Sequence, residues 1–311
     1  MSNNSINMKF DQASTNFKEV QSSGEKKYSM LHHWTLKKSW YLLDEVRRRV
    51  KRNKKTYKRG AIIYVDYGVN IGREFSGPHF SVVLNNFDSK NNEKLTVIPL
   101  TSKKHAHTIE LTNTIQETSM EFLSQSLYDI LKVPIAEKVV VDNLLNKLDP
   151  DHEITDPIEL VKSITDIKSS TEPDTPANAN NRIPLPDGWS NRMVQELSDV
   201  KTSLDYVKTY IAQTEGISKK EVTGEMLHSY IHGANFDNLI TNAQDLFVVF
   251  DKYKQYNLRT FARPMDITTI SKRRIRKINK FDPIGKIKVS SETLDAIEAG
   301  IKQLYFKKVD N

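Results

Sequence analysis

The sequence contains no cysteine, which excludes disulfide bonds and metal sites built on thiolates. It also has no window that approaches about eighteen consecutive apolar residues, so we expect no transmembrane helix. Residues 1–20 lack the basic segment followed by an apolar one that marks a signal peptide. These absences favour a cytoplasmic protein that binds no membrane, and no motif in the chain predicts a metal or another cofactor.

The charges are unevenly distributed along the chain. Its 311 residues are 38% hydrophobic and 27% charged, which allows a real core, and the formal net charge is +7. Residues 26–59 hold thirteen Lys or Arg against two acids, residues 271–311 eleven against five, and residues 111–200 seven against sixteen. Clustered cations favour a polyanion partner, with nucleic acid as the first candidate. Solvated helix faces would have the same composition.

The N-terminal region divides into two predicted parts. Residues 1–28 are polar, and we expect a disordered tail. Residues 29–57 predict a basic amphipathic helix, because apolar residues recur at three- and four-residue steps: Leu36, Trp40, Leu43, Val46 and Val50. We expect this face to pack on an apolar surface and the cations opposite, such as Lys37, to point to solvent. A helix that lies on a membrane surface has the same pattern.

Short runs of β-branched and aromatic residues follow, separated by turn residues. They predict strands at residues 61–68, 80–87, 95–102 and 107–111, and a loop at residues 70–79 that contains two glycines and a proline. Short strands at this spacing are typical of a small barrel or a curled antiparallel sheet. We therefore predict the first part of a small β-barrel at residues 58–114.

The rest of the chain changes character twice. Residues 115–257 have helical patterns and excess acid, with a Pro-, Asn- and Ser-rich linker predicted at residues 165–190. Strand patterns return at residues 258–311, which end in a predicted helix. Two domains in series would explain this order, but an insertion is favoured because the first four strands leave a sheet edge open. The prediction is an α+β fold in which a helical insertion interrupts a small β-barrel.

The predicted barrel carries a specific set of residues. A basic residue and a glycine open the first strand, an aspartate ends it, a Gly-x-Glu-x-x-Gly loop follows, and the third strand ends in Ile-Pro-Leu-Thr-Ser: Arg59, Gly60, Asp66, Gly72, Glu74, Gly77 and residues 98–102. This pattern resembles the PemK/MazF family of toxin ribonucleases from type II toxin–antitoxin modules. With the stretch MDITTISKRRI at residues 265–275, the resemblance covers about residues 58–111 and 258–308.

The resemblance implies an SH3-like small β-barrel that forms a homodimer and takes single-stranded RNA in a groove. It implies a toxin that an antitoxin protein neutralises and that cleaves RNA at specific sequences without a metal. In that reaction the ribose 2′-hydroxyl attacks the adjacent phosphate and leaves a cyclic phosphate and a 5′-hydroxyl. Two alternatives remain open, namely a non-catalytic nucleic-acid-binding barrel and an inhibitory protein-binding module of the same fold.

One position departs from the family pattern. Members commonly place an arginine, followed by proline, two residues after the last loop glycine, where this chain has His79. Histidine titrates near neutrality, so we predict that His79 transfers the proton in the reaction. Thr101 is predicted to hydrogen-bond the phosphate, and Glu74 either to act as a second acid or base or to bind loop amides. A purely structural histidine would instead mean an inactive site.

The residues predicted to bind substrate lie in the two loops around these groups. Cations would offset the phosphate charge, an aromatic ring would stack on a base, and hydroxyls would add hydrogen bonds: Arg73, Lys103, Lys104, Phe75, Ser76 and Ser102. The basic stretch at residues 271–280 is expected either to extend the RNA path or to solvate a sheet edge.

Overall fold

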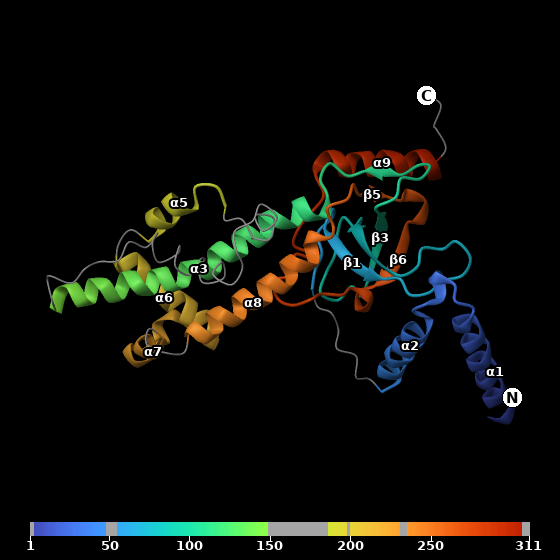
Figure 1. Ribbon diagram of the computed structural model, residues 1–311, viewed down its shortest axis with the longest axis horizontal. Helices are drawn as coiled ribbons and strands as arrows, with labels where there is room; N and C mark the ends of the chain where they lie inside the picture. The colour runs from blue at the N-terminus through green and yellow to red at the C-terminus, as the bar shows by residue number, and fades with distance from the viewer. Residues whose placement is uncertain (1–2, 48–54, 149–185, 198–199, 231–234, 307–311) are drawn as a thin grey trace. The chain divides into compact units, whose positions relative to one another are not determined.

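The computed structural model describes residues 3–47, 55–148, 186–197, 200–230 and 235–306. The chain divides into two compact units (Figure 1). The first comprises Met1–Thr114, Leu258–Lys277 and Ile284–Asn311 and contains the sheet. The second comprises Ile115–Asn257 and Ile278–Pro283 and is helical.

The first unit is built on a six-stranded antiparallel sheet. Its strands, in chain order, are β1 (Ile62–Asp66), β2 (Pro78–Val83), β3 (Lys94–Thr101), β4 (Ile109–Glu110), β5 (Phe261–Ala262) and β6 (Thr268–Ser271). They lie in the order β1-β2-β3-β5-β4, and β6 also pairs with β3. Strands from both sides of the helical segment therefore share one sheet, and β3 pairs with β2, β5 and β6.

The α+β class predicted from the sequence is confirmed, but a closed barrel is not seen. In the part of the chain that the structure describes, the edge strands β1 and β4 do not pair with each other. Isolated bridges join Ala61 to Lys288 and Val65 to Ile275 beside β1. The SH3-like barrel therefore stays a prediction.

The sheet is buried on both faces even at its edge strand β1. Ile62, Ile63 and Val65 of β1 are each 0% exposed, whereas a strand with one face in water alternates between buried and exposed residues. Helix α9 (Ser291–Tyr305) contacts β4 and the 3-10 turn η6 (Pro264–Asp266), and its Ile297 is fully buried. The β-branched runs that predicted the strands therefore also form the core.

The N-terminal region differs from the prediction in two ways. The predicted disordered tail is wrong over α1 (Asn3–Ser22), which is helical, and its Ile6, Phe10 and Phe17 recur at helical spacing. The helix predicted at residues 29–57 is observed as the shorter α2 (Leu31–Val46). Residues 48–54 lie outside the described residues.

The orientation of α2 is also the reverse of the prediction. Trp40 is 55% exposed and Leu36 is 49% exposed, although the apolar face was expected to pack. Lys37 instead points to the sheet unit, where it forms an ion pair with Asp66 at 2.8 Å. Charged partners on the sheet unit therefore decide which side of α2 faces inward.

The second unit is a helical assembly. Its elements are α3 (Ile115–Leu148), α5 (Trp189–Glu196), α6 (Val200–Glu215), the turn η4 (Lys219–Glu221), α7 (Gly224–Ser229) and α8 (Asn235–Lys254). Helix α3 packs against α6 and α8, and the core contains Leu123, Ile211 and Phe250. The predicted linker at residues 165–190 lies largely outside the described residues. Among the helices that the structure describes, none has the length and hydropathy needed to cross a bilayer.

The helical segment is inserted between two neighbouring strands. β4 and β5 pair directly, with Ile109 opposite Ala262, and the Leu111 amide donates to the Thr260 carbonyl at 2.8 Å. The chain therefore leaves and returns to the sheet where a hairpin turn would otherwise connect β4 to β5.

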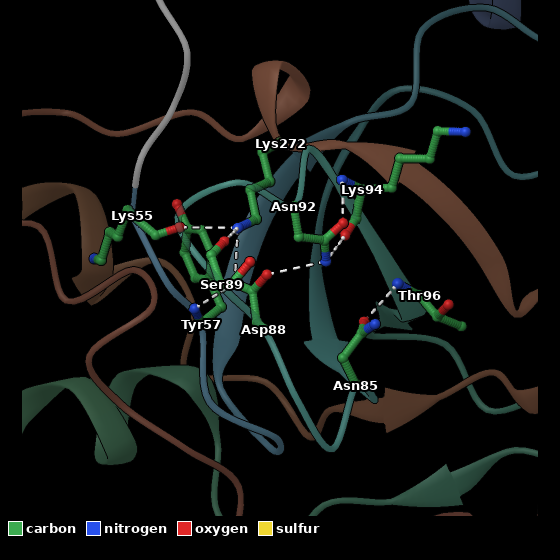
Figure 2. A network of polar contacts seen from close by, with 9 residues as sticks. All are labelled: Lys55, Tyr57, Asn85, Asp88, Ser89, Asn92, Lys94, Thr96 and Lys272. Carbon is green, nitrogen blue, oxygen red and sulfur yellow. Dashed lines mark hydrogen bonds and ion pairs between the residues drawn. The ribbon is translucent and has the colours of Figure 1, made fainter.

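A buried ion pair joins three segments of the sheet unit (Figure 2). The Lys272 ammonium lies 2.8 Å from Asp88 Oδ2 and donates to the carbonyls of Lys55 and Ser89 at 3.0 and 3.1 Å. Asp88 Oδ2 also accepts from the Tyr57 amide at 2.8 Å. Both charged side chains are nearly inaccessible, at 2% and 1% exposed. The network ties the segment before β1, the β2–β3 loop and the 3-10 turn η7 (Lys272–Arg274) together.

We expect Lys272→Met to lower the free energy of unfolding by about 3–5 kcal/mol, because it leaves the Asp88 carboxylate buried without its cation. Urea unfolding measures this value. Lys94→Met is the matched control, since Lys94 is exposed and enters the network only through backbone atoms (Figure 2). Equal losses in the two variants would show that the ion pair does not support the fold.

Candidate functional site

The loop between β1 and β2 is stabilised by hydrogen bonds between its own residues. The Tyr67 amide donates to the Gly77 carbonyl at 3.0 Å, and the Gly77 amide donates to the Gly68 carbonyl at 2.7 Å. Asn70 braces the interior, because its side-chain amide donates to the carbonyls of Tyr67 and Phe75 at 3.3 and 2.8 Å. Gly77 adopts a φ of +85°, a conformation that favours glycine. The loop Tyr67–Gly77 is therefore a defined turn that presents residues 73–75.

His79 lies at the start of β2, next to this loop. It pairs with Val65 of β1, is half-buried, and its ring centroid lies 4.4 Å from that of Phe75. Burial lowers the pKa of His79 below its ordinary value and the charge of Arg263 lowers it further, while hydrogen bonds to the backbone of Ser76 and Leu100 act in the opposite direction. The ring is thus biased toward its neutral form at the rim of the core.

Thr101 ends β3, next to the Leu100 backbone that the His79 ring contacts. The β2–β3 pairing ends with Ser81 opposite Pro99, so His79 and Thr101 each lie two residues beyond it, at the same end of the sheet. Thr101 is half-buried, and its hydroxyl accepts from the Lys103 amide at 3.2 Å. The hydroxyl therefore supports the turn after β3. Thr101 lies at the end of the sheet where β2 begins with His79.

The predicted cations and Glu74 lie on the surface around this pair. Arg73 and Glu74 are exposed on the Tyr67–Gly77 loop, and Ser102, Lys103 and Lys104 are exposed on the loop after β3. The structure thus places two exposed loops beside the strand ends that carry His79 and Thr101.

Ser76 is placed as a structural residue of the loop. Its hydroxyl accepts from the Asn70 amide at 3.1 Å and donates to the Glu74 carbonyl at 3.1 Å. These bonds fix the turn in the backbone that precedes His79, so a direct contact of Ser76 with substrate stays a prediction.

Arg263 is a candidate site residue that the sequence analysis did not name. It follows β5, and its amide donates to the Pro99 carbonyl at 3.0 Å, so it lies beside the end of β3. Its guanidinium carbon is 5.3 Å from the centre of the Phe75 ring, and its charge acts on His79. Asp266 Oδ2 forms an ion pair with the guanidinium Nε at 2.5 Å. The only signal in the sequence was a cation directly after a short apolar strand in the second strand block.

The candidate site therefore combines four groups. They are an imidazole biased toward its uncharged form, a guanidinium held by an ion pair, a hydroxyl and an aromatic ring: His79, Arg263, Thr101 and Phe75. An imidazole of this kind can accept a proton, and a guanidinium can stabilise negative charge on a phosphate. In the described residues, no three His, Asp or Glu side chains gather as metal ligands.

One of three comparisons with known proteins gives a match. Residues 58–138 match the family model of the PemK-like, MazF-like toxins of type II toxin–antitoxin systems. The family resemblance is thereby confirmed over the matched residues, which run from just before β1 into α3. The second block of the resemblance, residues 258–308, lies outside the match. No match was found among curated proteins or among solved structures.

We expect the pKa of His79 to lie below the ordinary histidine value and to rise in Arg263→Gln, because that change removes a nearby positive charge. The proton titration of the His79 ring, followed by NMR, measures both. Because folding lowers this pKa, the contribution of His79 to stability is lost as the pH falls through the ordinary histidine range.

Arg259→Gln is the control for this titration. Arg259 lies shortly before β5, whereas Arg263 follows it. Arg259 pairs with Glu110 on an exposed edge of the sheet, so its loss should leave the pKa of His79 unchanged. A pKa that does not move in Arg263→Gln would show that the guanidinium does not act on the ring.

Proposed function

We propose that the protein is a toxin-type endoribonuclease that cleaves single-stranded RNA at specific sequences. The observation that carries this proposal is the position of His79. Its ring is half-buried, lies beside Phe75 and the Leu100 backbone near the end of β3, and is close enough to Arg263 for the positive charge to lower its pKa. The family match supports the class of activity, since it covers the strand and loop that carry His79.

The proposed reaction is an internal transfer at the phosphate. The 2′-oxygen forms a bond to phosphorus, the bond from phosphorus to the 5′-oxygen breaks, and the products are a cyclic phosphate and a 5′-hydroxyl. His79 accepts the 2′-hydroxyl proton, a role that suits a ring held in its neutral form. The leaving 5′-oxygen takes up a proton, for which Glu74 on the adjacent loop is the candidate donor besides water.

The remaining groups bind and stabilise. Arg263 takes the part that the family assigns to the arginine of the loop, because a fixed guanidinium offsets charge that develops on the phosphate. Thr101 contributes its hydroxyl, and Phe75 offers a ring face for a base. The exposed Lys103 and Lys104 extend positive charge along the backbone of the RNA, and Arg73 and Ser102 lie beside them on the two loops.

The proposal includes the other features of this family. An antitoxin protein would neutralise the activity, the active form would be a homodimer, and the sheet would have the connectivity of an SH3-like barrel. Residues 115–257 would be an insertion that the chemistry does not require, because all proposed site residues lie outside it.

We expect the purified protein to cut mixed single-stranded RNA in the presence of EDTA and to leave cyclic-phosphate ends. His79→Ala should slow cleavage about 100- to 10,000-fold through loss of the proton acceptor. Arg263→Gln should slow it about 100- to 1,000-fold through loss of charge stabilisation. Arg259→Gln, the same substitution on an exposed edge, should cleave at the wild-type rate.

The outcome of this assay separates the candidate functions. Tight, salt-sensitive RNA binding without fragments would favour a non-catalytic nucleic-acid-binding protein. Neither binding nor cleavage would favour a protein-binding module. Cleavage that survives in His79→Ala would remove the histidine from the mechanism.

We expect a chain in which a short turn replaces residues 114–257 to keep its RNA cleavage. The paired ends at Leu111 and Thr260 are close enough for such a turn. Cleavage and a thermal unfolding curve measure the result. Asp282 would lose its partner Tyr253, whose hydroxyl donates to it at 2.8 Å, so Asp282→Asn is added to the shortened chain. A folded but inactive product would show that the helical unit takes part in the reaction.

A further inference from the structure

Three arginines that follow β6 make their contacts within the sheet unit: Arg273, Arg274 and Arg276. The Arg273 guanidinium contacts Glu45 and Asp44 of α2 at 2.9 and 3.3 Å. Arg274 lies over the Trp34 ring, with 5.1 Å between its guanidinium carbon and the ring centre. Arg276 forms an ion pair with Asp66. Arg273 and Arg274 thus contact α2 directly, whereas the sequence analysis expected this stretch to extend an RNA path or to solvate a sheet edge.

Helix α2 contributes matching groups on its inward side. The Tyr41 hydroxyl donates to the Arg273 carbonyl at 3.2 Å, and Lys37 pairs with Asp66 at 2.8 Å. Asp66 is 5% exposed, and burial alone would raise its pKa, but Lys37 and Arg276 hold the pKa below its usual value. An ionised, buried Asp66 therefore depends on a cation from α2.

These contacts meet the Tyr67–Gly77 loop at its base and its tip. A side chain at Gly68 would place its Cβ 2.2 Å from Trp34 Cε2, so the ring lies directly on the Gly68 backbone. The Asp66 carboxylate accepts from the Gly68 amide at 3.2 Å. The Lys27 ammonium, just before α2, donates to the Gly72 carbonyl.

We propose that α2 sets the position of the Tyr67–Gly77 loop for catalysis, with Trp34 and Lys37 as positioning residues. This rests on the proposed function, because the loop carries Glu74 and Phe75 and the Phe75 ring packs on His79. Neither Trp34 nor Lys37 touches the proposed reacting groups. They act through Gly68 and Asp66, and a small displacement of the loop would move Phe75 away from His79. A misplacement of about 1 Å can cost about a hundredfold in rate.

The first test is independent of RNA and uses the full chain. Hydrogen exchange at the Gly68 and Gly77 amides reports the base of the loop, because the first donates to the Asp66 carboxylate and the second to the Gly68 carbonyl. We expect Trp34→Ala and Lys37→Met to speed exchange at both amides at least tenfold. Exchange at the Val83 amide, which donates to Ala61 inside the sheet, should stay unchanged.

The matched controls lie on the exposed side of the same helix. Trp40→Ala and Lys38→Met make the same substitutions at exposed positions and should leave exchange at Gly68 and Gly77 unchanged. Lys37→Arg keeps the charge opposite Asp66 and should restore protection. If Trp34→Ala fails to fold, Lys37→Met and Lys37→Arg still give the comparison.

The second test is cleavage of RNA under saturating substrate. We expect Trp34→Ala and Lys37→Met to lower kcat about tenfold to a hundredfold with a smaller change in KM, and Lys37→Arg to recover kcat. Unchanged exchange at Gly68 and Gly77 would overturn the positioning of the loop by α2, whatever the RNA result. Faster exchange with unchanged kcat would overturn its role in catalysis. A wild-type chain that cuts no RNA would overturn the proposed function, and with it that catalytic role.

Discussion

The proposed site depends on the pairing of one strand, β3, with neighbours on both sides. β2 pairs with β3 up to Pro99, and β5 pairs with β3 at Leu100 and Thr101. Because both neighbours are antiparallel to β3, the start of β2 and the short strand β5 lie beside the carboxyl-terminal part of β3, and Arg263, which follows β5, lies opposite Pro99. That geometry brings His79, Thr101 and Arg263 to one end of the sheet. A shift of either register by one residue would turn the side chains of the shifted strand to the opposite face.

Much of this arrangement could be predicted from the sequence because it is local. Runs such as IIYVD and FSVV give strands in any context that buries them, and a Gly-x-Glu-x-x-Gly stretch between them predicts a turn. The position of His79 at the point where a loop enters a strand followed from this reasoning, and its role in catalysis stays a proposal. The exposed loop after β3 followed from its polar composition in the same way.

What could not be predicted depends on contacts between distant residues. Arg263 lies far along the chain from His79, and only the pairing of β5 with β3 brings it to the site. The orientation of α2 was predicted in reverse, because its apolar stripe is the stronger periodic signal. The inward side is instead chosen by Asp66 and Arg273, which a helix pattern by itself cannot reveal. The α1 helix was missed because a polar average hides a sparse apolar repeat.

The location of the positive charges says more about nucleic-acid binding than the net charge of the chain does. Lys272, Arg273 and Arg276 all have acidic partners within the sheet unit, and an ion pair that is already formed adds little attraction for a phosphate. The exposed cations of the Tyr67–Gly77 loop and of the loop after β3 lie beside the proposed reacting groups instead. A net charge of +7 therefore argues for nucleic acid only weakly, and the exposed cations around His79 (Arg73, Lys103 and Lys104) are the stronger argument.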